Sequence, residues 1–125
     1  MFTIYSRLIG DVEPFEHLEG AEGLTLGQAV KLAGGSLAKC GPTEKPTYMI
    51  VGVRTGEGKY PAIRVLPTTI FQTTASATLA QNALGAPVTL NATADGVTAT
   101  TEGGVFTPTF TDGETGGGVV RGYFA

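Results

Sequence analysis

Short runs of apolar and β-branched residues, separated by glycine- and proline-containing turns, make up most of this 125-residue chain. The most continuous run is residues 47–54 (TYMIVGVR), and two further runs follow it at 61–66 and 68–74. Short runs that alternate with turn residues are typical of the strands of a β-sandwich or β-barrel. The pattern therefore predicts an all-β fold built from short antiparallel strands.

A β-hairpin is predicted in the first half of the chain. Residues 24–32 (LTLGQAVKL) alternate near their end, the turn AGG follows at 33–35, and SLAKC at 36–40 suits the returning strand. In the second half, strands are expected at 87–91, 105–110 and 119–124.

The segment at 75–85 (ASATLAQNALG) stands apart from these runs. Its composition suits a helix, but its weak apolar spacing leaves a helical turn and a loop equally open.

The N-terminal residues follow a different pattern. Residues 2–9 (FTIYSRLI) are extended in character but have no hairpin partner nearby, and residues 10–23 are acidic and interrupted by Pro14. The proline favours an irregular arm over a stable helix, although a short helical turn near 13–18 stays open. We therefore expect an N-terminal arm and linker at 1–23, and a single small β-barrel or β-sandwich domain at 24–125.

Composition and charge narrow the classes of function. Glycine and threonine occur 19 times each, which suits turns and strands. The net charge is −3, which argues against a nucleic-acid binder and against docking on an anionic membrane. No apolar stretch approaches the roughly 18 residues of a membrane-spanning helix. The single cysteine, Cys40, cannot form an internal disulfide, which favours synthesis in a reducing compartment.

Few side chains suit catalysis. His17 is the only histidine, and it would share a helical face with Glu13 only if Pro14 allowed a helix there. Cys40 would need a nearby base to act as a nucleophile, and His17 is the only histidine that could serve. We therefore expect no catalytic residues and a non-enzymatic protein.

Metal and cofactor sites are not expected either. Asp95, Asp112 and Glu114 fall in turns, where such residues usually bond their own backbone, and they lack the alternating spacing of a calcium loop. The glycine-rich runs are not followed by the lysine and helix of a phosphate-binding loop.

Two stretches of the sequence resemble small capsid decoration proteins of tailed bacteriophages. The first, residues 23–74, contains AVKL at 29–32, a Leu-x-Lys at 37–39 and KPTYM at 45–49, separated by turns and loops. The second, residues 103–124, is similar to the C-terminal end of such proteins. The resemblance implies a structural protein that binds the outer surface of the capsid after maturation and stabilises the head.

The same resemblance implies partners and a location. The partner would be the major capsid protein, and the chain would form a homo-oligomer, with a trimer favoured. It would reside on the outer surface of the virion after synthesis in the bacterial cytoplasm, and no nucleic acid, membrane or cofactor would be needed.

Two other functions remain open. One is a tail, neck or fibre β domain of a virion, although the chain has no Trp of the kind that immunoglobulin sandwiches often bury. The other is a carbohydrate-binding β-sandwich, which would need exposed aromatic rings. Most of the 4 Tyr and 6 Phe fall at strand positions that suit a core.

The N-terminal segment is the candidate partner-binding site. An unpaired strand with large apolar side chains is costly in a soluble monomer, because it invites aggregation. We therefore expect the segment to pack against the capsid protein or a neighbouring copy, with its edge supplying backbone hydrogen bonds. The residues concerned are Phe2, Ile4, Tyr5, Arg7 and Phe15. The alternative is an internal edge strand of the same domain.

Overall fold

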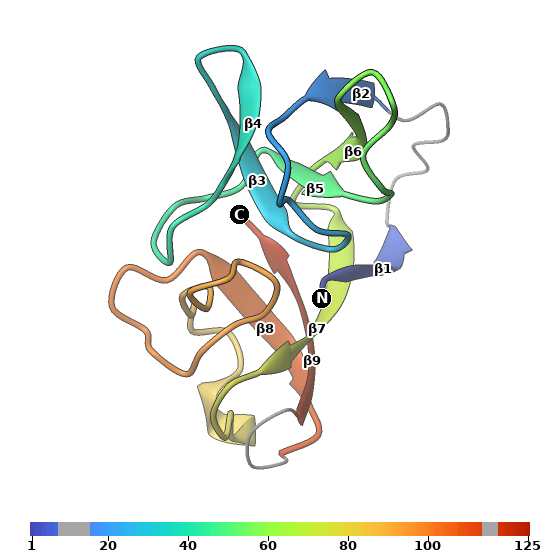
Figure 1. The fold of residues 1–125 in the computed structure, drawn as a ribbon. Helices are drawn as coiled ribbons and strands as arrows, with labels where there is room; N and C mark the ends of the chain where they lie inside the picture. Colours follow the sequence, from blue (N-terminus) through green and yellow to red (C-terminus); the bar gives the residue numbers. More distant parts are fainter. Residues whose placement is uncertain (8–15, 114–117) are drawn as a thin grey trace.

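The computed structural model describes residues 1–7, 16–113 and 118–125, and its strands form two antiparallel sheets (Figure 1). The strands in chain order are β1 (Thr3–Arg7), β2 (Glu16–Glu19), β3 (Ala29–Ala33), β4 (Ser36–Lys39), β5 (Tyr48–Ile50), β6 (Lys59–Arg64), β7 (Thr69–Ala75), β8 (Phe106–Thr111) and β9 (Gly118–Phe124). Helix in the described residues is limited to the 3-10 turn η1 (Gln81–Ala83). The all-β prediction is confirmed, and the sheets stay open rather than closing into a barrel.

The four-stranded sheet has the order β1-β7-β9-β8. Its strands alternate between buried and more exposed residues, most regularly in β9. The inward positions hold phenylalanines, and the rings of Phe106 and Phe124 lie with centroids 5.0 Å apart. Gly122 occupies another inward position of β9. A larger residue would not fit there, because a Cβ would stand 2.2 Å from the backbone oxygen of Thr107. One face of this sheet is therefore closely packed core.

The five-stranded sheet has the order β2-β6-β5-β3-β4. The predicted β3–β4 hairpin is confirmed: Ala33 pairs with Ser36 across Gly34 and Gly35. Both glycines have positive φ, 61° and 86°, as a two-residue turn that matches the strand twist requires. The sheet curls so that the residue after β2, Gly20, forms a single bridge to Leu37 of β4.

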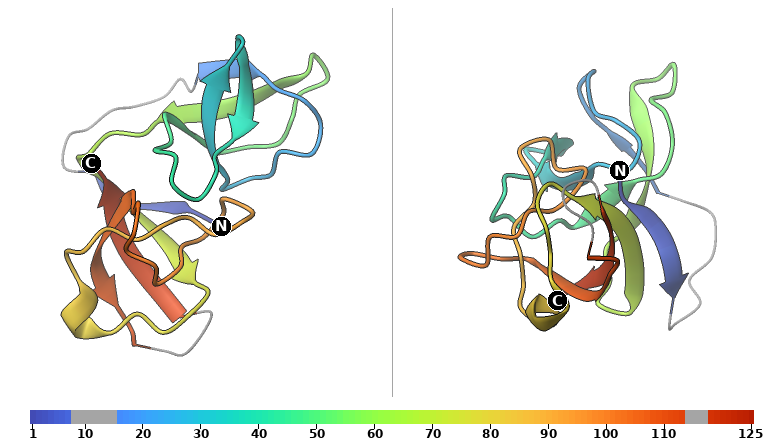
Figure 2. Two further views of the ribbon diagram at one scale, coloured as in Figure 1. Left: turned by 90° about the vertical axis from the view of Figure 1, so that its left-hand side faces the viewer. Right: turned by 90° about the horizontal axis from the view of Figure 1, so that it is seen from below.

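The main core joins the two sheets. It combines side chains from the five-stranded sheet, such as Met49, with the phenylalanines of the four-stranded sheet and with Leu79, Val88 and Val97 from residues 76–105. Figure 2 shows this last segment, in yellow and orange, beside the four-stranded sheet. A smaller cluster of buried residues comprises Val30, Leu37, Tyr48, Ile50, Tyr60 and Ala62. The main core thus joins the two sheets, and the smaller cluster belongs to the five-stranded sheet alone.

The N-terminal residues are part of the sheets. β1 pairs antiparallel with β7, so the expectation of a strand without a mate in its own chain is wrong. The partner is more than 60 residues away in sequence (Thr3 pairs with Gln72), so no local hairpin signal could reveal it. In the acidic segment, residues 16–19 form β2 and pair with β6, rather than an irregular arm or helical turn.

Several predicted strands are shorter than expected or absent, and the run at 24–32 forms a strand only over Ala29–Ala33. The run at 47–54 is regular only over Tyr48–Ile50, because the next pair would place Val51 opposite Pro61, which has no N–H to donate back. Residues 87–91 form isolated bridges rather than a strand. Their N–H groups donate to separate segments: Val88 to Phe106 and Leu90 to Pro42.

Candidate functional site

The outer face of the four-stranded sheet carries an arginine in contact with two aromatic rings. The guanidinium carbon of Arg121 lies 3.9 Å from the ring centre of Tyr5 and 4.4 Å from that of Phe110. Its Nε–H donates to Oε1 of Gln72 at 2.9 Å. A cation over an aromatic face is attracted by the ring's quadrupole, so these contacts hold the side chains together. We call Tyr5, Gln72, Phe110 and Arg121 the arginine–aromatic cluster.

Each member of the cluster comes from a different strand. Arg121 of β9 is directly opposite Gln72 of β7 on one side and Phe110 of β8 on the other. Tyr5 comes from β1 at the sheet's edge, at a register shift between Ile4 and Ser6. A second shift lies between Pro108 and Phe110. Such bulges redirect side chains, and here they accompany both aromatic residues on the outer face.

The cluster combines exposure with a fixed geometry. The Tyr5 side chain is 53% exposed and that of Phe110 is 39% exposed, whereas Arg121 is half-buried. The four strands of this sheet contain two arginines, Arg7 and Arg121, and no Asp or Glu, although the whole chain has a net charge of −3. Tyr and Arg are the residue types that dominate binding hot spots in protein interfaces. The face therefore carries residue types that are common at binding hot spots.

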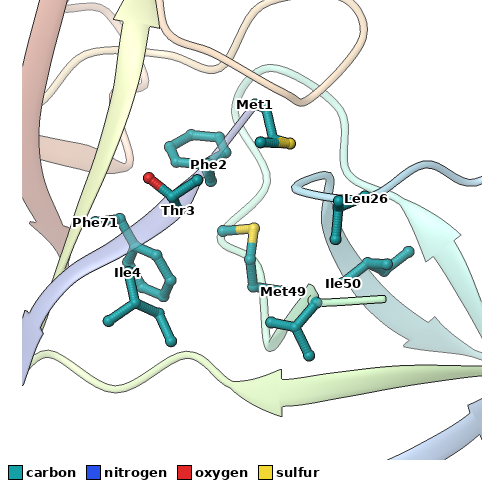
Figure 3. A pocket seen from close by; sticks show the side chains of 9 residues that line it. Met1, Phe2, Thr3, Ile4, Leu26, Met49, Ile50 and Phe71 are labelled. Carbon is teal, nitrogen blue, oxygen red and sulfur yellow. The ribbon is translucent and has the colours of Figure 1, made fainter. Parts of the chain in front are cut away.

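An apolar pocket lies beside β1, where the two sheets meet (Figure 3). Its volume is about 190 Å³. Phe2 and Ile4 line one side, and Leu26 and Met49 lie across from them. A pocket of this size and lining can hold one apolar group. Its lining has no charged side chain, and Thr3 is the one lining residue with a polar side chain.

The residues predicted to bind a partner have different environments. Phe2 is only 3% exposed, and its ring lies within 6.4 Å, centroid to centroid, of the rings of Phe71, Phe106 and Phe124. Ile4 is half-buried and packs against the same core. Tyr5 alone is prominently exposed, and it joins the cluster.

The remaining two predicted positions add less to this site. Arg7 is half-buried at the end of β1, and it has an interaction within the chain. Phe15 lies outside the described residues.

The candidate catalytic residues lie apart from this face. Cys40 is fully buried, and burial, with a smaller contribution from the charge of Glu44, raises the pKa of its thiol to about 11. His17 is exposed on β2, opposite Pro61 of β6. The described ranges contain no group of three His, Cys, Asp or Glu side chains arranged to hold a metal ion.

The turn carboxylate Asp95 has local partners. Its Oδ1 accepts hydrogen bonds from Thr93 Oγ1 at 2.6 Å and from Asn91 Nδ2 at 3.0 Å. These bonds, with that from Thr93 the stronger cause, lower the pKa of Asp95. Asp112 accepts a bond from the backbone N–H of Val119, and Glu114 lies outside the described residues. Both described carboxylates thus bond groups of their own turns.

Glu16 forms an ionic network on the five-stranded sheet. Arg64 Nε donates to Glu16 Oε2 at 2.9 Å, and Tyr48 Oη donates to Oε1 at 3.2 Å. The bond from Arg64 is the main cause of a lowered Glu16 pKa. The network joins β2 to β6 and β5, which explains how the short strand β2 is held at the edge of its sheet.

Membrane-spanning helices and similar known proteins were the remaining possible sources of information on function. No helix among the described residues is long and apolar enough to span a membrane. Comparison with known proteins finds no matching family model, no matching curated protein and no matching solved structure.

Proposed function

We propose that this chain is a non-enzymatic structural protein that binds the outer surface of a bacteriophage capsid and stabilises the mature head. The observation that carries the proposal is the arginine–aromatic cluster, an exposed group of hot-spot residue types on a rigid sheet. The resemblance of residues 23–74 and 103–124 to capsid decoration proteins supports the same conclusion.

The architecture suits a protein that acts by binding alone. Each cluster residue comes from a hydrogen-bonded strand, so little conformational freedom is lost when a partner binds. A homo-oligomer, with a trimer favoured, would bring several copies of this face to the shell at once. Several simultaneous contacts raise the overall affinity without requiring any one contact to be strong.

Co-sedimentation tests this proposal. The purified chain is mixed with expanded capsids assembled from the major capsid protein of the phage that encodes the chain, and unexpanded shells serve as the control. We expect the chain to sediment with expanded capsids and to raise the temperature at which these shells dissociate. Failure to bind expanded capsids contradicts the proposal.

A carbohydrate-binding function is the second candidate, because the exposed rings of Tyr5 and Phe110 are of the kind that stack on sugars. A glycan array distinguishes the two functions. Capsid binding without glycan binding supports the structural role, whereas glycan binding that Tyr5→Ala abolishes, without capsid binding, favours the alternative.

A further inference from the structure

Most of the hydrogen-bond donors of the Arg121 side chain are not used within the described residues. A guanidinium has five N–H donors, and the one recorded bond of this side chain runs from Nε to Gln72. No carboxylate in the described part of the chain forms an ion pair with it. The Nη donors of Arg121 therefore have no partner among the described residues.

The surroundings of Arg121 favour an anionic group that can accept two parallel bonds. The Tyr5 and Phe110 contacts hold the guanidinium in place, and its half-buried position strengthens any charge interaction it makes. A carboxylate matches the fork of guanidinium donors in a bidentate pair. The four strands around it contribute two arginines and no acidic residue, so no carboxylate of these strands would repel an anionic group there.

We propose that the arginine–aromatic cluster is a receptor for one Asp or Glu side chain on the outer surface of the capsid protein. The carboxylate accepts hydrogen bonds from the Nη groups of Arg121, and the rings of Tyr5 and Phe110 pack against the apolar atoms beside it. This inference rests on the proposed function, and it names the chemical group that the partner must supply.

Substitutions at Arg121 test the proposal by co-sedimentation with expanded capsids. Arg121→Gln removes the charge and the fork, and we expect it to weaken binding about 10- to 100-fold, as loss of a charged hydrogen-bonded pair does. Arg121→Lys keeps the charge but not the bidentate geometry, and should weaken binding less. Lys45→Gln, which removes one positive charge at an exposed loop, is the control and should bind as wild type does.

Cross-linking identifies the acceptor directly. A carbodiimide joins an amine to a carboxylate at contact distance, so it should couple the lysine introduced by Arg121→Lys to the capsid protein. Mass spectrometry of the digested product should find one Asp or Glu of the capsid surface at this link. Replacing that residue by Asn or Gln should weaken binding of the wild-type chain to the extent that Arg121→Gln does.

The outcomes separate the two proposals. If wild type does not bind expanded capsids, the proposed function and this inference both fail. If wild type binds and a folded Arg121→Gln variant binds equally well, or if no cross-link to a capsid carboxylate forms, only the receptor inference is overturned. A thermal melt monitored by circular dichroism confirms that each variant is folded.

Discussion

At the scale of single residues, the bond between Arg64 and Glu16 makes stability depend on pH. The lowered pKa of Glu16 means that the folded state favours the carboxylate. The stability that this preference gives to the folded state is complete above pH 4.5, the ordinary pKa of a glutamate side chain. It is lost as the pH falls through the lower pKa that Glu16 has in the folded state. The effect is small, because both side chains are partly exposed to solvent.

The Glu16→Gln variant tests this contribution. Wild type should be more stable than the variant at about pH 7, and the difference should shrink as the pH approaches about 3. Urea unfolding at both pH values measures it, with Glu102→Gln as a control for removing one charge from an exposed turn. An unchanged difference across this range would show that Glu16 titrates alike in the folded and unfolded chain.

Gly122 is a second residue with a measurable role. Its missing side chain lets the backbone oxygen of Thr107 and the ring of Phe106 approach β9 closely. Gly122→Ala should lower the free energy of unfolding by about 1–3 kcal/mol, the usual cost of an overpacked core. Gly56→Ala, at a turn glycine with open space around it, should change it by less than about 0.5 kcal/mol. Equal effects of the two substitutions would contradict the packing described for β9.

Cys40 gives a probe of global unfolding. Its thiol is fully buried, and its pKa of about 11 keeps it protonated near neutral pH. A thiol-reactive chromophore should therefore label Cys40 slowly in the folded chain and rapidly in urea. Rapid labelling without denaturant would mean that the β4 end of the core opens readily.

At the scale of elements, β1 combines two roles on its two faces. Phe2, just before the strand, contributes to the phenylalanine core, whereas Tyr5 contributes to the exposed cluster. Truncation of the strand removes both contributions at once. Point substitutions can separate the strand's part in folding from its part in binding.

The pair Phe2→Ala and Tyr5→Ala tests this separation. Phe2→Ala should lower the free energy of unfolding by about 3–5 kcal/mol, as loss of a buried aromatic ring does. Tyr5→Ala should change stability far less, by about the 0.5–2 kcal/mol of an aromatic–cation contact, while it weakens capsid binding. Denaturant unfolding and co-sedimentation measure the two effects. A folded Phe2→Ala variant of unchanged stability would show that the N-terminus does not belong to the core.

Local patterns were sufficient for the elements that carry their own strand or turn residues. The β3–β4 hairpin follows from Gly34 and Gly35, and the runs that became β6, β7, β8 and β9 carry their own apolar and β-branched residues. The sheet positions of β1 and β2 could not be predicted, because each pairs with a single strand that is 40 or more residues away. Their edge positions depend on tertiary packing, which no local pattern contains.

At the scale of the whole molecule, the candidate site depends on the same distant pairings. Tyr5 was predicted to bind a partner because its strand lacked a visible mate, and that reason is wrong. Arg121 and Phe110 were missed, since only the register of β8, β9, β7 and β1 brings them to Tyr5. The alternation of GVVRGYF in β9 was the available signal that Arg121 faces away from the core.

The two faces of the molecule differ in their exposed aromatic side chains rather than in net charge. The strands of the four-stranded sheet carry two arginines and no acidic residue, and those of the five-stranded sheet carry four Lys or Arg residues and two Glu. Only the first sheet combines an arginine with the exposed rings of Tyr5 and Phe110. This feature leads to the central claim, that the chain binds a capsid shell through its four-stranded sheet.

Electron cryomicroscopy of expanded capsids mixed with the chain tests that claim most directly. We predict density for the chain on the outer surface of the shell, with Tyr5, Phe110 and Arg121 at the contact and a capsid carboxylate beside Arg121. Bare shells at saturating concentrations of the chain, or bound copies whose four-stranded sheet faces solvent, would contradict the account.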